Sequence, residues 1–180
     1  YLEINSLYDA QAKYAEAMQQ VFAALALYEA VGDQKGIAIC YTHLCDLLYY
    51  EDKYAESVEY CDKAIDIQQK INETDDLATS YRFKASSLLF MDGEIETALT
   101  TINLAIEILK NNEDQQISYM ASRNTRGNIL KYMERYDEAV QDYIYNYEQS
   151  KAMGLYRYTI PSIANIGHVY LMQEKYSEAL

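Results

Sequence analysis

The sequence predicts an all-α fold made of repeated antiparallel helix hairpins, and three observations predict it. Half of the 180 residues are hydrophobic, and one proline and six glycines are too few for a turn-rich all-β protein. Residues of high helix propensity, such as Leu, Ala, Glu, Gln, Met and Lys, are abundant. One short phrase also recurs along the chain at a nearly constant interval.

The phrase is D-K-Y-A-E-S-V at 52–58, where Asp52 is in a position to cap a helix. Close copies occur four more times, as K-Y-A-E-A-M at 13–18, E-I-E-T-A-L at 94–99, R-Y-D-E-A-V at 135–140 and K-Y-S-E-A-L at 175–180. Each copy contains one aromatic or aliphatic anchor, and these are Tyr14, Tyr54, Ile95, Tyr136 and Tyr176, spaced by 40, 41, 41 and 40 residues. A fixed period of about 40 residues indicates a repeat array.

Further positions stay in register with the anchors. The third residue after each anchor is small, namely Ala17, Ser57, Ala98, Ala139 and Ala179, and so is the ninth before it, namely Asn5, Cys45, Ser86, Gly127 and Gly167. The sixth residue before each anchor is large and apolar, namely Tyr8, Leu48, Leu89, Leu130 and Tyr170. Small residues on both helices of a hairpin allow the backbones to approach closely.

The elements follow in order from the polar breaks. Short breaks such as Y-E-D-K, M-D-G-E and M-E-R lie just before the anchors and predict the turn inside each hairpin. After the anchor, apolar residues recur at helical spacing, as in Ile95, Leu99, Ile102 and Ile106. Longer polar breaks separate the units. We therefore expect one domain, 1–180, with units of approximately 1–33, 34–73, 74–114, 115–155 and 156–180, both terminal units being incomplete.

The order large apolar, small, large apolar, turn, Tyr, x, Glu, Ala resembles the tetratricopeptide repeat (TPR). The best copies are I-G-H-V-Y-L-M-Q-E-K-Y-S-E-A-L at 166–180 and L-C-D-L-L-Y-Y-E-D-K-Y-A-E-S-V at 44–58. The unit is longer than the usual TPR and looks like the long units of bacterial regulatory proteins and kinesin light chains. The resemblance implies a right-handed superhelical solenoid whose first helices line a concave groove, and whose ends expose stacking surface.

By this resemblance, a defined set of side chains is expected to face the groove and to hold a protein or peptide ligand. The set is rich in aromatic residues and has amides at its centre; it comprises Asp46, Tyr49, Tyr50, Phe83, Ser87, Phe90, Asn124, Asn128, Lys131, Tyr132 and His168. Exposed aromatic surface can hold apolar side chains, and amides can pair with a bound backbone. The alternative is that these side chains merely pack between neighbouring first helices.

Three arginines, Arg82, Arg123 and Arg126, occupy positions on first helices where family copies usually carry large apolar residues. A charge in such a position must be paired or must reach solvent. The expected partners are acids of nearby linkers, namely Asp75, Asp76, Glu113 and Asp114. A bound anionic group is the alternative.

Little in the sequence supports catalysis or metal binding. Cys40, His43 and Cys45 are close in sequence, but Cys45 lies on a different face of a helix from Cys40, so packing is the favoured interpretation and a metal site the alternative. No glycine-rich phosphate loop occurs. We expect no enzyme activity and no cofactor.

The net charge and the cysteines restrict which partners and which cellular compartment are expected. A net charge of −13 and the lack of any basic run argue against binding of nucleic acid or of a membrane by this segment. Three cysteines with no disulfide pattern favour a reducing compartment. We therefore expect a cytoplasmic location, with a periplasmic sensor segment left open.

These observations favour a peptide-binding or protein-binding scaffold or sensor module, forming part of a larger regulatory or signalling protein. The alternative is a structural module that associates through its exposed end repeats, for example as a homodimer.

Overall fold

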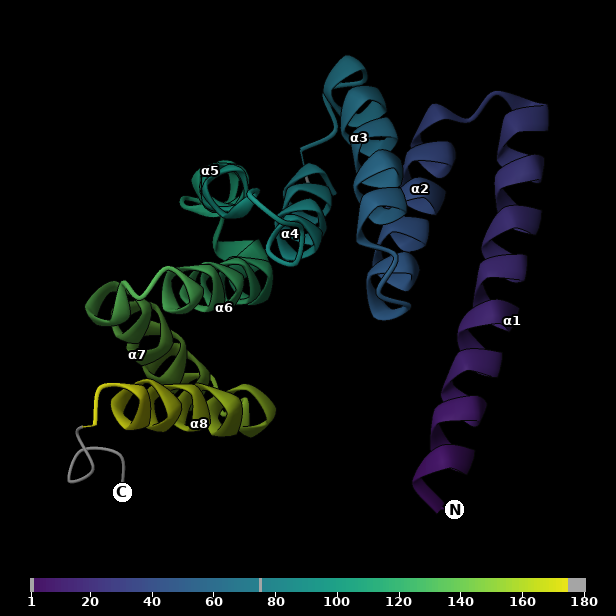
Figure 1. Ribbon diagram of the computed structural model, residues 1–180. Helices are drawn as coiled ribbons and strands as arrows, with labels where there is room; N and C mark the ends of the chain where they lie inside the picture. Colours follow the sequence, from purple (N-terminus) through teal and green to yellow (C-terminus); the bar gives the residue numbers. More distant parts are fainter. Residues whose placement is uncertain (1, 75, 175–180) are drawn as a thin grey trace. The chain divides into compact units, whose positions relative to one another are not determined.

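The computed structural model describes residues 2–74 and 76–174, and this part of the chain is helical with no β-strand (Figure 1). The elements in chain order are α1 (Leu2–Val31), α2 (Gln34–Tyr50), α3 (Tyr54–Lys70), α4 (Leu77–Leu88), α5 (Ile95–Leu109), the 3₁₀ turn η1 (Glu113–Gln115), α6 (Gln116–Tyr132), α7 (Tyr136–Ala152) and α8 (Tyr156–Met172). The all-α prediction is confirmed. Among the described residues, no helix is both long enough and apolar enough to cross a membrane.

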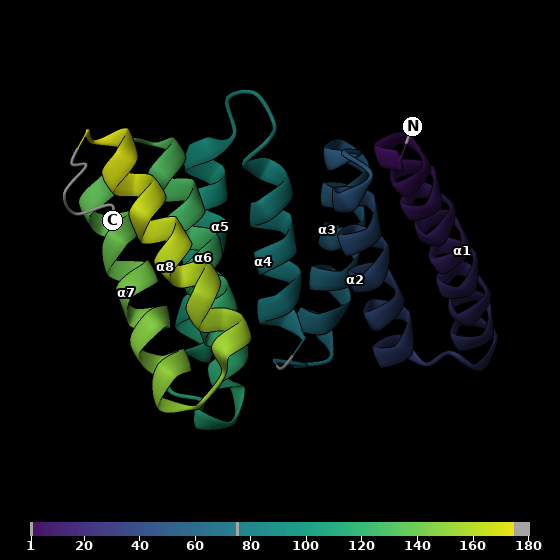
Figure 2. The same cartoon turned by 90° about the horizontal axis from the view of Figure 1, so that it is seen from below.

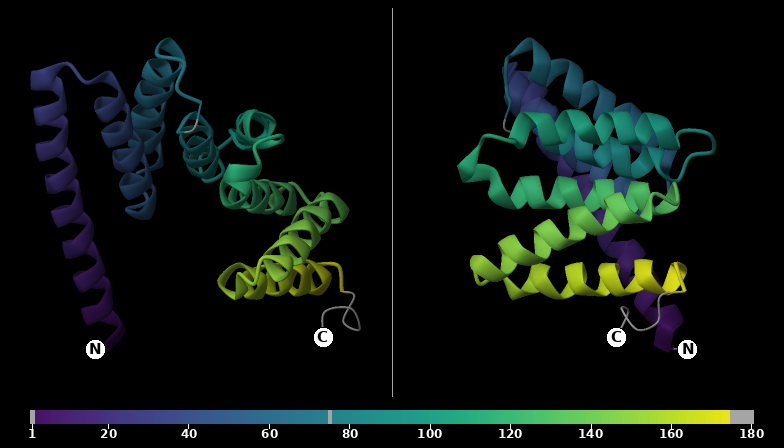
Figure 3. Two further views of the ribbon diagram at one scale, coloured as in Figure 1. Left: turned by 180° about the vertical axis from the view of Figure 1, so that it is seen from behind. Right: turned by 90° about the vertical axis from the view of Figure 1, so that its left-hand side faces the viewer.

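The helices form two compact units, Tyr1–Glu94 and Ile95–Leu180. In the first unit, α2 and α3 form a hairpin, α1 packs on α2, and α4 packs on both helices of the hairpin (Figure 2). In the second unit, α6 packs on α5 and α7, and α8 packs on α7 (Figure 3). From α2 onward, a helix that precedes an anchor, called a first helix, alternates along the chain with a helix that begins at the anchor, called a second helix.

The turns before the anchors share one backbone feature. The second residue before the anchor has a left-handed φ in four copies, with values of 58° at Asp52, 78° at Gly93, 59° at Glu134 and 58° at Glu174. The chain then reverses, and after Asp52 and Glu134 the next backbone N–H donates to a carbonyl of the preceding helix, from Lys53 to Leu48 and from Arg135 to Leu130. Asp52 is therefore the turn residue and not the helix cap, because α3 is preceded by Lys53 at its N-cap.

The first copy of the phrase does not mark a turn, which corrects the prediction for that copy. α1 runs without interruption through 13–18, because the preceding segment D-A-Q-A-K contains no Gly, Pro or Asn and consists mostly of good helix formers. The last copy, with Tyr176 and Ala179, lies outside the described residues, as do the side chains of Asn5 and Tyr8.

The small residues in register with the anchors are packing positions. Cys45, Ser57 and Ala139 are fully buried. A β-carbon added at Gly127 in α6 would lie 2.7 Å from Cε1 of Tyr143 in α7. In the second unit these helices close over a core of buried residues, which are Leu130, Ala139, Val140, Tyr143 and Val169.

Cys45 in α2 and Cys61 in α3 form a disulfide with a Cα–Cα distance of 5.4 Å, while Cys40 is free and buried. This corrects the expectation that the three cysteines carry no disulfide pattern. The two cysteines are 16 residues apart, and the antiparallel hairpin returns the second beside the first. With its sulfur in this bond, Cys45 is not available as the thiolate that a metal site with Cys40 and His43 would need.

Candidate functional site

In the first unit, the predicted groove residues of α2 lie within a cluster of aromatic rings. Tyr14 stacks on Tyr50, with centroids 5.8 Å apart and planes 4° from parallel, and Tyr49 meets Tyr50 edge-on at 5.4 Å. Phe90, just after α4, lies 6.1 Å from Tyr49 and 5.1 Å from Tyr54. The cluster is accessible, since Tyr50 is 55% exposed and Phe90 is 43% exposed. It therefore presents an apolar face to solvent.

Asp46 and Arg82 place opposite charges close to these rings. Asp46 is half-buried, and its Oδ1 atom is buried with no hydrogen-bond partner among the described residues. Desolvation raises the pKa of Asp46, although Arg82 and His43 act in the opposite direction. Desolvation also lowers the pKa of Arg82, although the charge of Asp46 acts to raise it. The guanidinium of Arg82 lies 4.2 Å from the ring centroid of Phe83, which places this predicted groove residue in the same neighbourhood.

Ser87 is misplaced in the predicted set. Its side chain is fully buried, and its hydroxyl lies 2.7 Å from the hydroxyl of Ser57. Ser57 in turn donates to the backbone carbonyl of Cys45 at 2.7 Å. Ser87 therefore faces the packed interior of the first unit, where two small hydroxyls let α4 approach α3, and no ligand can reach it.

In the second unit, the two predicted amides already have partners. Tyr143 donates its hydroxyl proton to Oδ1 of Asn128 at 2.8 Å, and Asn165 of α8 donates to Oδ1 of Asn124 at 3.1 Å. The Asn124–Asn165 bond joins neighbouring first helices, as the packing interpretation expects. The Nδ2 groups of Asn124 and Asn128 are donors in no hydrogen bond among the described residues, so each amide can still donate.

The remaining predicted residues lie on the same two helices. Lys131 is half-buried, and desolvation lowers its pKa. Its ammonium nitrogen is 5.7 Å from the ring centroid of Tyr132, which is 57% exposed. His168 is an exposed residue of α8. The second unit therefore presents amide donors, an exposed ring and a cation on its first helices.

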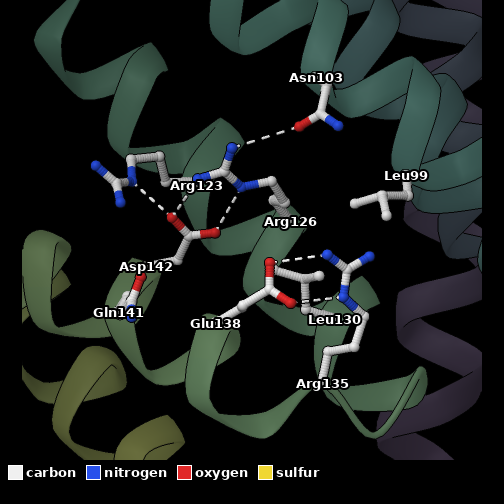
Figure 4. A pocket seen from close by; sticks show the side chains of 9 residues that line it. All are labelled: Leu99, Asn103, Arg123, Arg126, Leu130, Arg135, Glu138, Gln141 and Asp142. Atoms are coloured by element: carbon white, nitrogen blue, oxygen red, sulfur yellow. Dashed lines mark hydrogen bonds and ion pairs between the residues drawn. The ribbon is translucent and has the colours of Figure 1, made fainter.

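Two of the three arginines are paired, but not with the predicted linker acids. Arg123 donates from Nε to Asp142 Oδ1 at 2.7 Å, and Arg126 donates from Nε and Nη2 to the two Asp142 oxygens, each at 2.7 Å (Figure 4). Asp142 in α7 is only 1% exposed. This face of a first helix meets the second helix of its own hairpin, whereas the linkers lie at the hairpin ends. The repeat pattern carried no signal for this pairing, because Tyr60 and Thr101 stand at the positions equivalent to Asp142.

The alternation of helices, the close small-residue contacts and the left-handed turns define a helical repeat fold. Residues 36–111 match the tetratricopeptide repeat family, which confirms the resemblance seen in the repeated phrase. No curated protein sequence matches the chain significantly.

Solved structures show the same fold. A Rap protein complexed with competence and sporulation factor is 19% identical, with a TM-score of 0.82 over 97% of this chain and 48% of that one. This chain thus spans about half the length of the Rap protein. Two structures of a putative kinesin light chain from Podosopora anserina with nearly identical TPR-like repeats are each 16% identical over 98% of this chain. Their TM-scores are 0.71 and 0.69, over 86% and 87% of those chains.

Proposed function

We propose that this chain is a protein-interaction module that holds a peptide segment of a partner, within a regulatory or signalling protein. The observation that carries the proposal is the accessible aromatic cluster of the first unit, with Tyr50 and Phe90 at its surface. Aromatic rings at a protein surface provide large contact area at a small cost in conformational entropy, and they are frequent at the energetic centres of interfaces.

The chemistry around the cluster suits a peptide better than a purely apolar ligand. Asp46 and Arg82 offer an acceptor and donors beside the rings, as backbone amide groups require. On the second unit, Asn124 and Asn128 offer Nδ2 donors for backbone carbonyls, and Tyr132 offers a ring for a side chain. Each unit by itself thus combines polar groups for a backbone with an aromatic contact for a side chain.

One of the similar solved structures supports a binding role for this fold. The Rap protein was solved in complex with a factor that it binds. We therefore favour a sensor or scaffold role over a catalytic one for this chain.

A peptide-array screen followed by calorimetry tests the proposal, using the wild type, Tyr50→Ala and Tyr156→Ala. Tyr156 is an exposed tyrosine outside the predicted set, 70% accessible at the start of α8, and serves as the matched control. Loss of an aromatic anchor costs about 1.4 kcal/mol or more, so Tyr50→Ala should weaken a hit about tenfold. Equal affinity for all three proteins removes the aromatic cluster from the ligand site.

A second candidate is association through the ends of the array. Leu27 and Val31 of α1 are 72% and 77% exposed, and Ile160 of α8 is 69% exposed. Light scattering during size exclusion tests this role. A dimer at micromolar concentration that Ile160→Glu converts to a monomer supports it, and a wild-type monomer excludes it.

A further inference from the structure

A hollow of about 190 Å³ lies among α5, α6 and α7 of the second unit (Figure 4). Three of the chain's five arginines, Arg123, Arg126 and Arg135, line it. The Arg126–Asp142 pair lies on one side and the Arg135–Glu138 pair on another, and Leu99 and Asn103 reach in from α5. Its lining residues on α6 are Arg123, Arg126 and Leu130, none of which belongs to the predicted groove set.

The lining carries an excess of positive charge. Three guanidinium groups face two carboxylates, those of Asp142 and Glu138, which leaves one positive charge uncompensated among the lining residues. This is unusual in a chain with 15 basic and 28 acidic residues. Arg123 and Arg126 share a single carboxylate, so their mutual repulsion is only partly relieved.

Donor groups also remain unused. Arg135 donates Nε and Nη2 to Glu138 at 2.7 and 2.8 Å, and its Nη1 group donates to no described residue. The Nη1 group of Arg126 has only a long bond of 3.4 Å to Asn103 Oδ1. The charge of Arg126 also reaches Glu138, where it adds to the effect of Arg135 in lowering the pKa of that carboxyl. Two arginines that line the hollow thus each keep a donor group that is weakly bonded or unbonded among the described residues.

We infer that this hollow binds a small oxyanion, either a carboxylate or a phosphate, between Arg126 and Arg135. Guanidinium groups match the planar carboxylate and the phosphate by paired, charge-assisted hydrogen bonds. The volume is several times the roughly 30 Å³ share of one water molecule, so a group of four or five heavy atoms fits. The anion supplies the negative charge that the lining lacks.

The binding is modest, because Glu138 already holds two donors of Arg135 and Glu96 also acts on Arg135. We expect a dissociation constant on the order of 1 mM for a free anion. Glu138 therefore competes with the anion for Arg135 and lowers the affinity of the site. Replacing its carboxylate by an amide removes a competing charge and releases Arg135 toward the anion.

Nuclear magnetic resonance of the 180-residue chain tests the inference through the arginine Nε–Hε signals. Sodium phosphate and sodium acetate are titrated separately, with sodium chloride holding the ionic strength constant. Saturable shifts of the Arg126 and Arg135 signals are expected. Since one charge-assisted bond corresponds to about tenfold in affinity, Arg135→Gln should weaken binding about tenfold, and Glu138→Gln should strengthen it by a similar factor.

The controls separate the site from general charge effects. Arg135 and Glu138 are both exposed, so both variants should keep the wild-type helical circular dichroism. Lys110→Gln removes an exposed positive charge elsewhere in the same unit and should leave the affinity unchanged. Saturation by acetate alone identifies a carboxylate, by phosphate alone a phosphate, and by both the shared oxyanion chemistry. Linear shifts with both salts, or equal affinity of Arg135→Gln and wild type, overturn the inference.

Discussion

Gly127 of α6 lies directly against the ring of Tyr143 of α7, so that a β-carbon at this position would approach two ring atoms at 2.7 and 2.9 Å. Tyr143 cannot move aside easily, because it is fully buried and its hydroxyl is bonded to Asn128. The close approach of α6 and α7 therefore depends on the missing side chain.

Gly127→Leu should lower the free energy of unfolding by about 2–4 kcal/mol, since the larger side chain overpacks this contact. Urea denaturation followed by circular dichroism measures the change. Glu148→Leu, at an exposed site of α7, is the control and should alter stability little. A neutral Gly127→Leu variant would show that the two helices are not in close contact here.

The Asp142 carboxylate compensates two guanidinium groups in a nearly water-free position. Asp142→Ala should destabilise the protein by about 3–5 kcal/mol, because it leaves Arg123 and Arg126 half-buried without a counter-charge. Asp66→Ala removes an exposed ion pair with Lys70 and should cost less than about 1 kcal/mol. Urea denaturation of both variants makes the comparison. Equal effects would mean that the Asp142 cluster is open to water.

The turns offer a stabilising change. Glu134 holds a left-handed φ of 59°, which costs energy for a residue with a β-carbon but not for glycine, and Gly93 occupies the equivalent turn position. Glu134→Gly should raise stability by about 0.5–1 kcal/mol, observed as a higher melting temperature. Glu148→Gly, inside α7, should instead destabilise by about 1 kcal/mol. A lower melting temperature for Glu134→Gly contradicts the left-handed turn.

The sequence allowed the hairpins to be predicted because their packing rule is local and repeated. Gly127 lies against Tyr143, and at the equivalent positions Cys45 is bonded to Cys61, so the repeated pattern places both contacts. The Arg126 partner could not be found in this way. Tyr60 and Thr101 occupy the positions equivalent to Asp142, so that column gives no sign of a carboxylate.

The candidate site was likewise predictable only in part. The rings of Tyr49, Tyr50 and Phe90 were predicted to face one surface and do form one cluster. The stacking of Tyr14 on Tyr50 was not predicted, because it depends on α1 continuing as one helix where the repeat implied a turn. Long-range contacts that occur once in the chain leave no periodic signal.

Cys45 and Cys61 should be found linked in the purified protein, with Cys40 as a free thiol. Mass spectrometry of proteolytic peptides without reduction checks the pairing. A disulfide closing a loop of this length stabilises by about 3 kcal/mol, so reduction should lower the free energy of unfolding by a similar amount. Cys40→Ser, as the control, should leave the effect of reduction unchanged. Three alkylated thiols without prior reduction would contradict the disulfide.

The pH dependence of the free energy of unfolding tests whether the Asp46 carboxyl is desolvated. Desolvation raises its pKa in the folded chain above the ordinary value of 3.8, even with Arg82 and His43 nearby, so folding favours the protonated carboxyl. The stability that this group contributes is full below the unfolded pKa and is lost as the pH rises through the higher folded pKa. Asp46→Asn mimics the protonated form, and it should therefore be more stable than the wild type at about pH 7 and equally stable at about pH 3. Urea denaturation of the two proteins across this range measures the difference. A difference that stays constant with pH, or that grows toward acid, would show that the Asp46 carboxylate is not desolvated.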